Sequence, residues 1–445
     1  MSDKVELPIP FIGPKPIEEF IDTFLPNAKD DGWVPDGLTE PPQSPNHFVH
    51  MLENWARLCD TLVFTENEPP APPGLDGVLM PPRGVICAFH HSDDSDDSDA
   101  SGDADDVDDT DEPIPRTYRQ FWSKAELVIV QRTLEEDPFV DPIYPNNVYP
   151  RKEIDFEVPF ADAAQTRADL FMLADTQFKH QPRSFAFSVL VLDDYARLLR
   201  WDHTAVVVSE LFPWVHPSSP LFVFLSIFHD LAAERGWDLT VSVPSKAEAD
   251  LARAVFRKFA ADIKVGSDEP LERVSICDEH VLVVPARRLR GRGLGTERRT
   301  IGRLAVNVCA GTLVLWKDGW RTVAQGAEGQ ERRCLPEFVA HKILEVTRVP
   351  GATPMLCGGD VPGQRTLSQE HAAMDWACGM GDTPLVARQR HWVVLAKKVR
   401  GMSTFKSTHE LAQTVFGALR AHSQLQKEGQ VHGDISPYNI LIRDS

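Results

Sequence analysis

Two polar residues near the end of the chain, Asp434 and Asn439, stand in the segment VHGDISPYNIL, residues 431–441. At this spacing an aspartate can orient an attacking hydroxyl group and accept its proton, while the asparagine amide oxygen binds a magnesium ion that bridges nucleotide phosphates. A His-Gly pair precedes the aspartate, and three apolar residues follow the asparagine. The pattern is that of a phosphotransferase catalytic loop, so we expect the two side chains to face one cleft.

A phosphotransferase also needs a cation for the nucleotide phosphates. A run of residues that favour β-strand begins at Thr312 and ends in Lys317. The lysine that anchors nucleotide phosphates in a kinase N-lobe also lies on a strand. The segment 334–346 has helical spacing, and a glutamate on it would hold that lysine forward. Glu337 is the first choice and Glu345 the alternative. Taken singly, a lysine at a strand end is more often an ordinary surface residue.

The segment 287–303, which precedes that strand, is rich in glycine and arginine. Gly291, Gly293 and Gly295 would let the backbone bend closely over a phosphate, and seven arginines make the stretch basic. No glycine completes the G-x-G-x-x-G pattern at Thr296, and such stretches also occur as flexible linkers or nucleic-acid-binding tails. Its place just before the Lys317 strand favours a phosphate loop.

Three further segments would complete the scaffold. We expect a buried strand at 391–396, suited to the connection between two lobes where backbone groups meet an adenine. A helix should start after the capping residue Ser407, run to about Lys427 and close at Gly429. Residues 351–383 are rich in glycine and proline and are expected to form an inserted loop.

Composition limits the class of protein. With 445 residues, 42% of them hydrophobic, the chain can form two or three domains with sizeable cores. Twelve acidic residues lie between Asp93 and Glu112, and leaving them out changes the formal charge from −20 to −8. An acidic surface argues against general affinity for nucleic acid or for anionic membranes.

The cysteines and the N-terminus bear on the compartment. Seven scattered cysteines without a C-x-x-C pair indicate neither a disulfide framework nor a zinc site. The first residues carry charges and prolines where a secretory signal needs an apolar run, and no stretch reaches the ~20 apolar residues of a membrane span. We therefore expect a protein of the cytoplasm or nucleus, with no membrane partner.

The first 113 residues hold few signals of a packed core. Residues 1–90 are proline-rich; within them, 1–50 are expected to form loosely packed arms and 46–64 one amphipathic helix. The acidic side chains of residues 91–113 repel one another, and the segment cannot bury apolar surface. We therefore expect a disordered acidic loop. The loop lacks the glycine and glutamate positions of an EF-hand, which argues against calcium.

Residues 114–285 are expected to form an α+β domain. Helical spacing over 161–179 precedes three apolar runs that predict an antiparallel meander, 184–193, 195–201 and 205–208. Two helices follow, one over 221–235 that ends at the C′ glycine Gly236 and one over 246–261 that opens with a capping box at Ser245.

One catalytic alternative in this domain is a metal-dependent nuclease, because the acids Glu126 and Asp202 lie beside predicted strands. Such a site needs a lysine two positions after the strand glutamate, and Val128 stands there. Charge-paired carboxylates are therefore the preferred interpretation.

From residue 125 to the C-terminus the sequence resembles the fungal-type protein kinase family, a divergent branch of the protein-kinase-like fold. The matching segments are QPRSFAFSVLVLDDYARLLRWDHTAVVVS, GRG followed by TLVLWKDGW, FKSTHELAQTVFGALRAH, and VHGDISPYNIL. The resemblance implies ATP and Mg²⁺ as cofactors and Ser/Thr hydroxyls of proteins as acceptors. It implies that Lys317 contacts the α and β phosphates, that Asp434 is the catalytic aspartate and Asn439 a metal ligand, and that Gly291 and Gly293 belong to the phosphate loop.

The expected fold class is α+β: a protein-kinase-like fold with a β-rich N-lobe and an incomplete helical C-lobe, preceded by an α+β domain and the acidic loop. The expected parts are a proline-rich, partly helical region at 1–90, the acidic loop at 91–113, the α+β domain at 114–285 and the kinase-like domain at 286–445.

Three departures limit the resemblance. Gly433 replaces the arginine of H-R-D, so control through a phosphorylated activation loop is not expected. Ser436 stands where protein kinases often carry a phosphate-contacting lysine, and H-G-D followed by asparagine also resembles small-molecule phosphotransferases of the aminoglycoside and choline kinase type. The sequence reaches Ser445 without a D-F-G aspartate, so we expect this polypeptide to be nearly inactive. A non-catalytic pseudokinase that binds partners is a further alternative.

Overall fold

The computed structural model describes residues 9–25, 47–59, 62–65, 84–90, 121–142, 154–231, 235–260, 265–266, 269–277, 280–286, 293–294, 300–323, 336–348, 353–378, 385–396, 399–429 and 440–443. The acidic loop expected at 91–113 lies outside these ranges. The chain divides into two compact units. The first consists of residues 1–237, 293–296 and 366–385, and the second of residues 238–292, 297–365 and 386–445.

The first unit is built on one mixed sheet with the strand order β1-β7-β6-β5-β4-β3-β2, and β8 pairs with β6. The predicted meander is confirmed, since β5, β6 and β7 pair antiparallel in succession, while β1–β7 and β4–β5 pair parallel. The strands are β1 (Phe11–Lys15), β2 (Leu62–Thr65), β3 (Val85–His90), β4 (Ala125–Arg132), β5 (Phe185–Leu192), β6 (Tyr195–Asp202), β7 (Val206–Ser209) and β8 (Phe212–Pro213).

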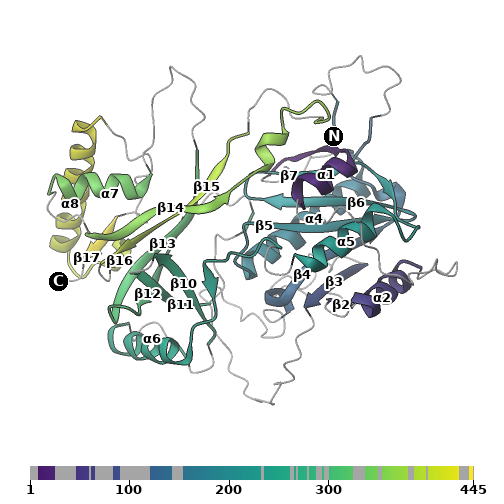
Figure 1. The fold of residues 1–445 in the computed structure, drawn as a ribbon. Coiled ribbons are helices and arrows are strands. Elements are labelled where there is room, and N and C mark those ends of the chain that lie inside the picture. The colour runs from purple at the N-terminus through teal and green to yellow at the C-terminus, as the bar shows by residue number, and fades with distance from the viewer. Residues whose placement is uncertain are drawn as a thin grey trace. The chain divides into compact units, whose positions relative to one another are not determined.

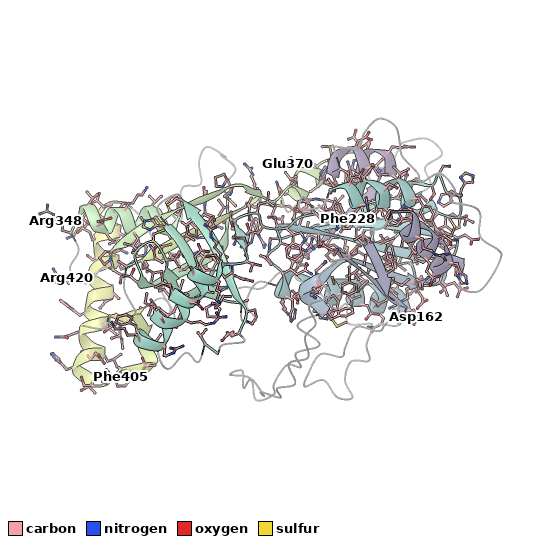
Figure 2. All side chains as sticks on the ribbon, turned by 60° about the horizontal axis from the view of Figure 1, so that its bottom comes forward. Asp162, Phe228, Arg348, Glu370, Phe405 and Arg420 are labelled. Atoms are coloured by element: carbon pink, nitrogen blue, oxygen red, sulfur yellow. The ribbon has the colours of Figure 1, made fainter. Side chains whose placement is uncertain are left out.

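Helices cover both faces of this sheet (Figure 1). Successive residues of a strand point to opposite faces, and on β4 the side chains of Leu127 and Ile129 enter one hydrophobic core while Val128 and Val130 enter the other. The first core contains α1 (Ile17–Phe24), α2 (His47–Cys59) and α5 (Pro220–Asp230), the helix that carries Phe228 in Figure 2; the second contains α4 (Ala161–His180).

Three expectations for this unit are wrong in whole or in part. The helix expected over 46–64 ends at Cys59, and Leu62–Thr65 form strand β2 instead. Residues 9–25 are not a loose arm, because β1 joins the sheet beside β7 and Phe20 of α1 is fully buried. Helix α5 ends at Asp230, well before Gly236, and Arg235 turns back so that its guanidinium donates to the carbonyl oxygens of Phe228 and His229. These donors satisfy carbonyl groups that a helix end leaves free.

The second unit is built on an antiparallel sheet with the order β14-β15-β13-β12-β11-β10-β9 and a two-stranded pair, β16 with β17. Its strands are β9 (Val241–Ser242), β10 (Leu271–Cys277), β11 (His280–Pro285), β12 (Thr300–Asn307), β13 (Thr312–Thr322), β14 (Met355–Arg365), β15 (Arg388–Leu395), β16 (Val399–Gly401) and β17 (Leu441–Arg443); its helices are α6 (Lys246–Phe259), α7 (Glu337–Val346) and α8 (Thr408–Lys427).

Several predicted elements of this unit are confirmed. Ser245 opens α6 with a capping box, and α8 starts after Ser407, whose hydroxyl accepts from the Glu410 amide. The loop expected at 351–383 is wrong in part, because this segment contains the eleven-residue strand β14, paired along β15. Glycine and proline have low strand propensity, so the local sequence does not indicate β14. The strand is held by β15, which follows about thirty residues later in the sequence.

The α+β class is confirmed by two sheets with covering helices, but the units divide between Trp237 and Asp238 rather than at 285/286. Residues 238–285 pair and pack with the second sheet: β11 pairs with β12, and α6 shares a core with Val306 and Leu313. None of the described helices is long and apolar enough to cross a membrane.

Candidate functional site

Strand alternation decides which way Lys317 points. On β13, Leu315 and Lys317 share one face, and Leu315 packs with Val393 of β15 and Phe338 of α7. The intervening Trp316 is fully buried on the opposite face, in a separate core. Lys317 therefore lies on the face of the sheet that α7 covers.

Helix α7 approaches this face closely because β14 has a glycine beneath it. A Cβ atom added to Gly358 would come within 2.8 Å of the Phe338 Cβ atom, whereas one added to Gly359 would meet nothing within 4 Å. Phe338 packs on the Leu315–Val393 patch. The glycine and the aromatic ring together bring the first turn of α7 to the middle of β13.

Glu337, the first residue of α7, forms an ion pair with Lys317. The two side chains are 26% and 14% exposed, respectively, so solvent screens the pair only in part. His341, one turn further along α7, places its Nε2 atom 3.8 Å from the same carboxylate oxygen. Glu337 also lies at the N-terminal end of its helix, where the backbone N–H groups favour a negative charge.

The pKa of Glu337 reflects this setting. Burial raises the pKa, but the neighbouring His341 and the charge of Lys317 outweigh burial and lower it from 4.5 to about 2. The carboxylate is therefore fully ionised at neutral pH, and it holds the Lys317 ammonium in one place. A lysine fixed in this way can meet an anionic ligand with little further ordering.

The structure decides between the two glutamates that the sequence offered. Glu337 pairs with Lys317, while Glu345 is exposed near the end of the same helix. The sequence analysis missed His341, although its spacing of four residues from Glu337 places both on one side of the helix. His341 is thus an addition to the predicted site.

Gly293 belongs to the first unit, whereas Lys317 belongs to the second. A Cβ atom on Gly293 would come within 2.3 Å of Asp175 Oδ1, and the same oxygen accepts the amide of the buried Leu294 at 2.7 Å. This close packing on α4 gives a structural reason for a glycine at 293. Its predicted place in a phosphate loop stays a prediction.

The remaining predicted site residues, Gly291, Asp434 and Asn439, lie outside the described residues. Two described elements flank the catalytic-loop segment. Helix α8 precedes it, and strand β17, which pairs with β16, follows it. Ile442 of β17 is buried.

Helix α8 exposes part of its apolar side. Phe416 and Leu419 are 62% and 61% exposed, and Leu425 is its one buried residue; Arg420, labelled in Figure 2, lies on the same helix.

Glu126 and Asp202, the two acidic residues considered for a nuclease site, both have partners within the first unit. Glu126 forms an ion pair with Arg183 (Nη2–Oε2 2.8 Å) and accepts from the indole of Trp237. Asp202 is fully buried beside Arg200. Both carboxylates are thus engaged in neutralising buried arginines, which is a structural task.

Comparison with known proteins gives one match. The family model described as fungal protein kinase matches residues 151–445, about two thirds of the chain. No curated protein and no solved structure matches. The match begins near α4 in the first unit and runs through the second, so it includes the Lys317–Glu337 pair as well as the Asp434 to Asn439 segment. The chain belongs to the fungal protein kinase family, whose general activity is protein-kinase-like phosphotransfer.

Proposed function

We propose that this protein binds ATP with Mg²⁺ and serves transfer of the terminal phosphoryl group to Ser/Thr hydroxyls of proteins, in a second unit that has the protein-kinase-like fold. The ion pair between Lys317 and Glu337 carries the proposal. Chain order supports it as well, since the lysine strand β13 is followed by the glutamate helix α7 and then by the buried strand β15, in the order that kinases use.

Each residue has a defined task in this proposal. Lys317, held by Glu337, donates to the α and β phosphates, and Asp434 orients the acceptor hydroxyl and takes its proton. Asn439 is the residue that would hold the metal. ATP with Mg²⁺ supplies the transferable phosphoryl group and neutralises its charge when bound.

Nucleotide binding tests the site directly. We expect Lys317→Met to weaken binding of ATP–Mg²⁺ by the purified chain at least about tenfold, because a charge-assisted hydrogen bond is lost. Arg321→Met is the matched control: this residue lies on the same strand but pairs with Asp360 (Nη2–Oδ2 2.6 Å). Equal affinity for ATP in wild type and Lys317→Met would rule out the proposed role of the pair.

Transfer is measured separately, with γ-labelled ATP, a mixture of protein substrates and phosphoamino-acid analysis. Label on serine or threonine that Asp434→Asn abolishes is the signature of the proposed reaction, and strong labelling of this kind would contradict the near-inactivity expected from the sequence. Label on a metabolite, with proteins unlabelled, would instead identify a small-molecule phosphotransferase. Nucleotide binding with no Asp434-dependent transfer to any acceptor would identify a binding module.

A further inference from the structure

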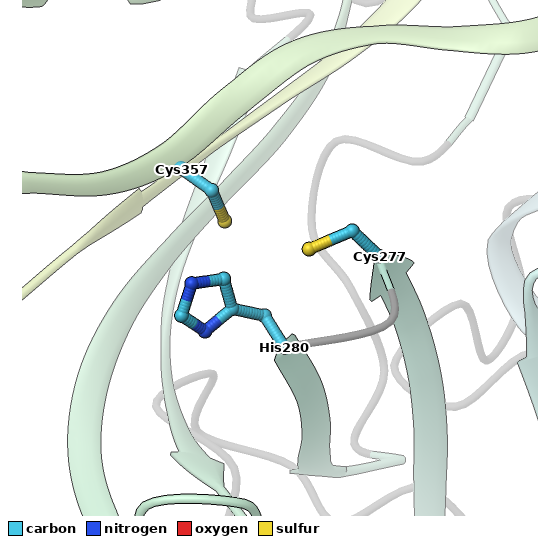
Figure 3. A group of neighbouring side chains, drawn as sticks. All are labelled: Cys277, His280 and Cys357. Atoms are coloured by element: carbon cyan, nitrogen blue, oxygen red, sulfur yellow. The ribbon is translucent and has the colours of Figure 1, made fainter.

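Three potential metal ligands meet in the second unit, and Cys357, one of them, packs against the face of the sheet opposite to that of Lys317. Cys277 ends β10, His280 begins β11, and Cys357 lies on β14 (Figure 3). Their ligand atoms all lie within 4.8 Å of one another. Figure 3 shows both sulfur atoms and one edge of the imidazole pointing toward a common space.

Two features of the fold bring these residues together. Cys277 and His280 stand three residues apart across the β10–β11 hairpin, a spacing that suits two ligands of one ion. Cys357 comes from the opposite edge of the same sheet, yet β10 and β14 share a hydrophobic core through Val274 and Val361. The sheet therefore curls until its two edge regions approach, which the strand order alone does not reveal.

The ring of His280 is oriented by Asn307, the last residue of β12. The Asn307 side-chain nitrogen lies 2.9 Å from Nδ1 of His280, which leaves Nε2 for the sulfur atoms. Asn307 is itself buried, and its Oδ1 atom accepts the backbone amides of Cys309 and Ala310 at 3.1 and 3.3 Å. The imidazole is thus fixed in position before any ligand binds.

We propose that Cys277, His280 and Cys357 form a binding site for a zinc ion, with a water molecule as the fourth ligand. Two thiolates and an imidazole are ligands that zinc prefers, and three protein ligands with one open position is an established zinc arrangement. The ion fastens β14 to the β10–β11 hairpin and so closes the curled sheet.

The ligand atoms themselves need to move only a short distance. Ligand atoms about 2.0–2.3 Å from one tetrahedral ion lie under about 4 Å apart, so no pair here has to close by more than about 1 Å. Cys277 is exposed and at the end of its strand, which leaves it free to move. Zinc displaces the protons of both thiols, and two protons are released for each ion bound.

The His280–Asn307 contact gives the site a specific chemical signature. With Asn307 donating to Nδ1, the neutral ring carries its proton on Nε2, so zinc binding requires that proton to move to Nδ1 and the Asn307 amide to turn. An aspartate at 307 would accept the Nδ1–H and still accept both backbone amides. Asn307→Asp should therefore tighten zinc binding, by about tenfold or more.

The test uses the reduced full-length chain freed of metal, titrated with zinc against a competing chelator and, in parallel, with cobalt to detect tetrahedral thiolate coordination by absorbance. We expect one zinc ion per chain, two protons released, and a loss of affinity of at least about a hundredfold in Cys277→Ser and in Cys357→Ser. Cys309→Ser, which removes another exposed cysteine of the same unit, should bind zinc as wild type does.

Three outcomes would overturn the proposal. The first is that the reduced wild-type chain binds no zinc, including the case in which Cys277 and Cys357 are found joined as a disulfide and take no metal after reduction. The second is that Cys309→Ser loses as much affinity as Cys277→Ser, which would mean adventitious thiol binding. The third is that Asn307→Asp folds, by circular dichroism, but binds zinc more weakly than wild type. None of these results bears on nucleotide binding at Lys317.

Discussion

The ionised Glu337 carboxylate should stabilise the second unit by an amount that depends on pH. Its pKa falls from 4.5 to about 2 on folding, a difference worth about 3 kcal/mol of folding free energy at neutral pH, because each tenfold change in proton affinity corresponds to 1.36 kcal/mol. Since the side chain is 26% exposed, solvent screening reduces the expected value to about 2 kcal/mol. The substitution Glu337→Gln should lower the free energy of unfolding by this amount at pH 7.

The sign of the pH dependence follows from the direction of the shift. A carboxylate whose pKa is lower in the folded state stabilises the fold above its unfolded pKa, and this contribution is lost as the pH falls from 4.5 toward 2. The difference in unfolding free energy between wild type and Glu337→Gln should therefore be constant from pH 7 to about 5.5 and shrink steadily below pH 5. Hydrogen exchange of β13 and β15, recorded as a function of urea concentration, measures this difference in the second unit.

Glu345→Gln provides the matched control, because this glutamate is exposed on the same helix. It should change the free energy of unfolding by less than about 0.5 kcal/mol at any of these pH values. The explanation of the Lys317–Glu337–His341 cluster is refuted if Glu337→Gln is as stable as wild type at pH 7, or if the difference between them does not change between pH 7 and pH 3.5.

Three further substitutions test close packing and helix capping in the two units. Gly358→Ala should destabilise the second unit by about 1–3 kcal/mol and weaken ATP binding, because the new methyl group pushes α7 from the sheet, whereas Gly359→Ala should do neither. Thermal unfolding and nucleotide titration of both variants check this. Gly293→Ala should destabilise the first unit by about 1–3 kcal/mol through its clash with Asp175, seen as increased hydrogen exchange in α4. Ser245→Ala, which removes the cap of α6, should cost about 1 kcal/mol in urea unfolding.

Local patterns predicted much of the secondary structure. The helical spacing at 161–179 and the alternating runs that form β5, β6 and β7 were found where the sequence placed them, because both depend on neighbouring residues along the chain. The N-terminal strand β1 and strand β14 were missed. Each is held by a partner distant in sequence, and proline and glycine mask its local preference.

The same distinction applies to the sites. The sequence by itself determined the family and the lysine strand, and it predicted the phosphotransferase loop, since each is a fixed spacing of particular residue types. Only the tertiary structure chose Glu337 over Glu345, added His341, and brought Cys357 to Cys277 and His280. Those contacts depend on how closely α7 approaches β14 and on how far the second sheet curls, and both are set by packing between segments far apart in the chain.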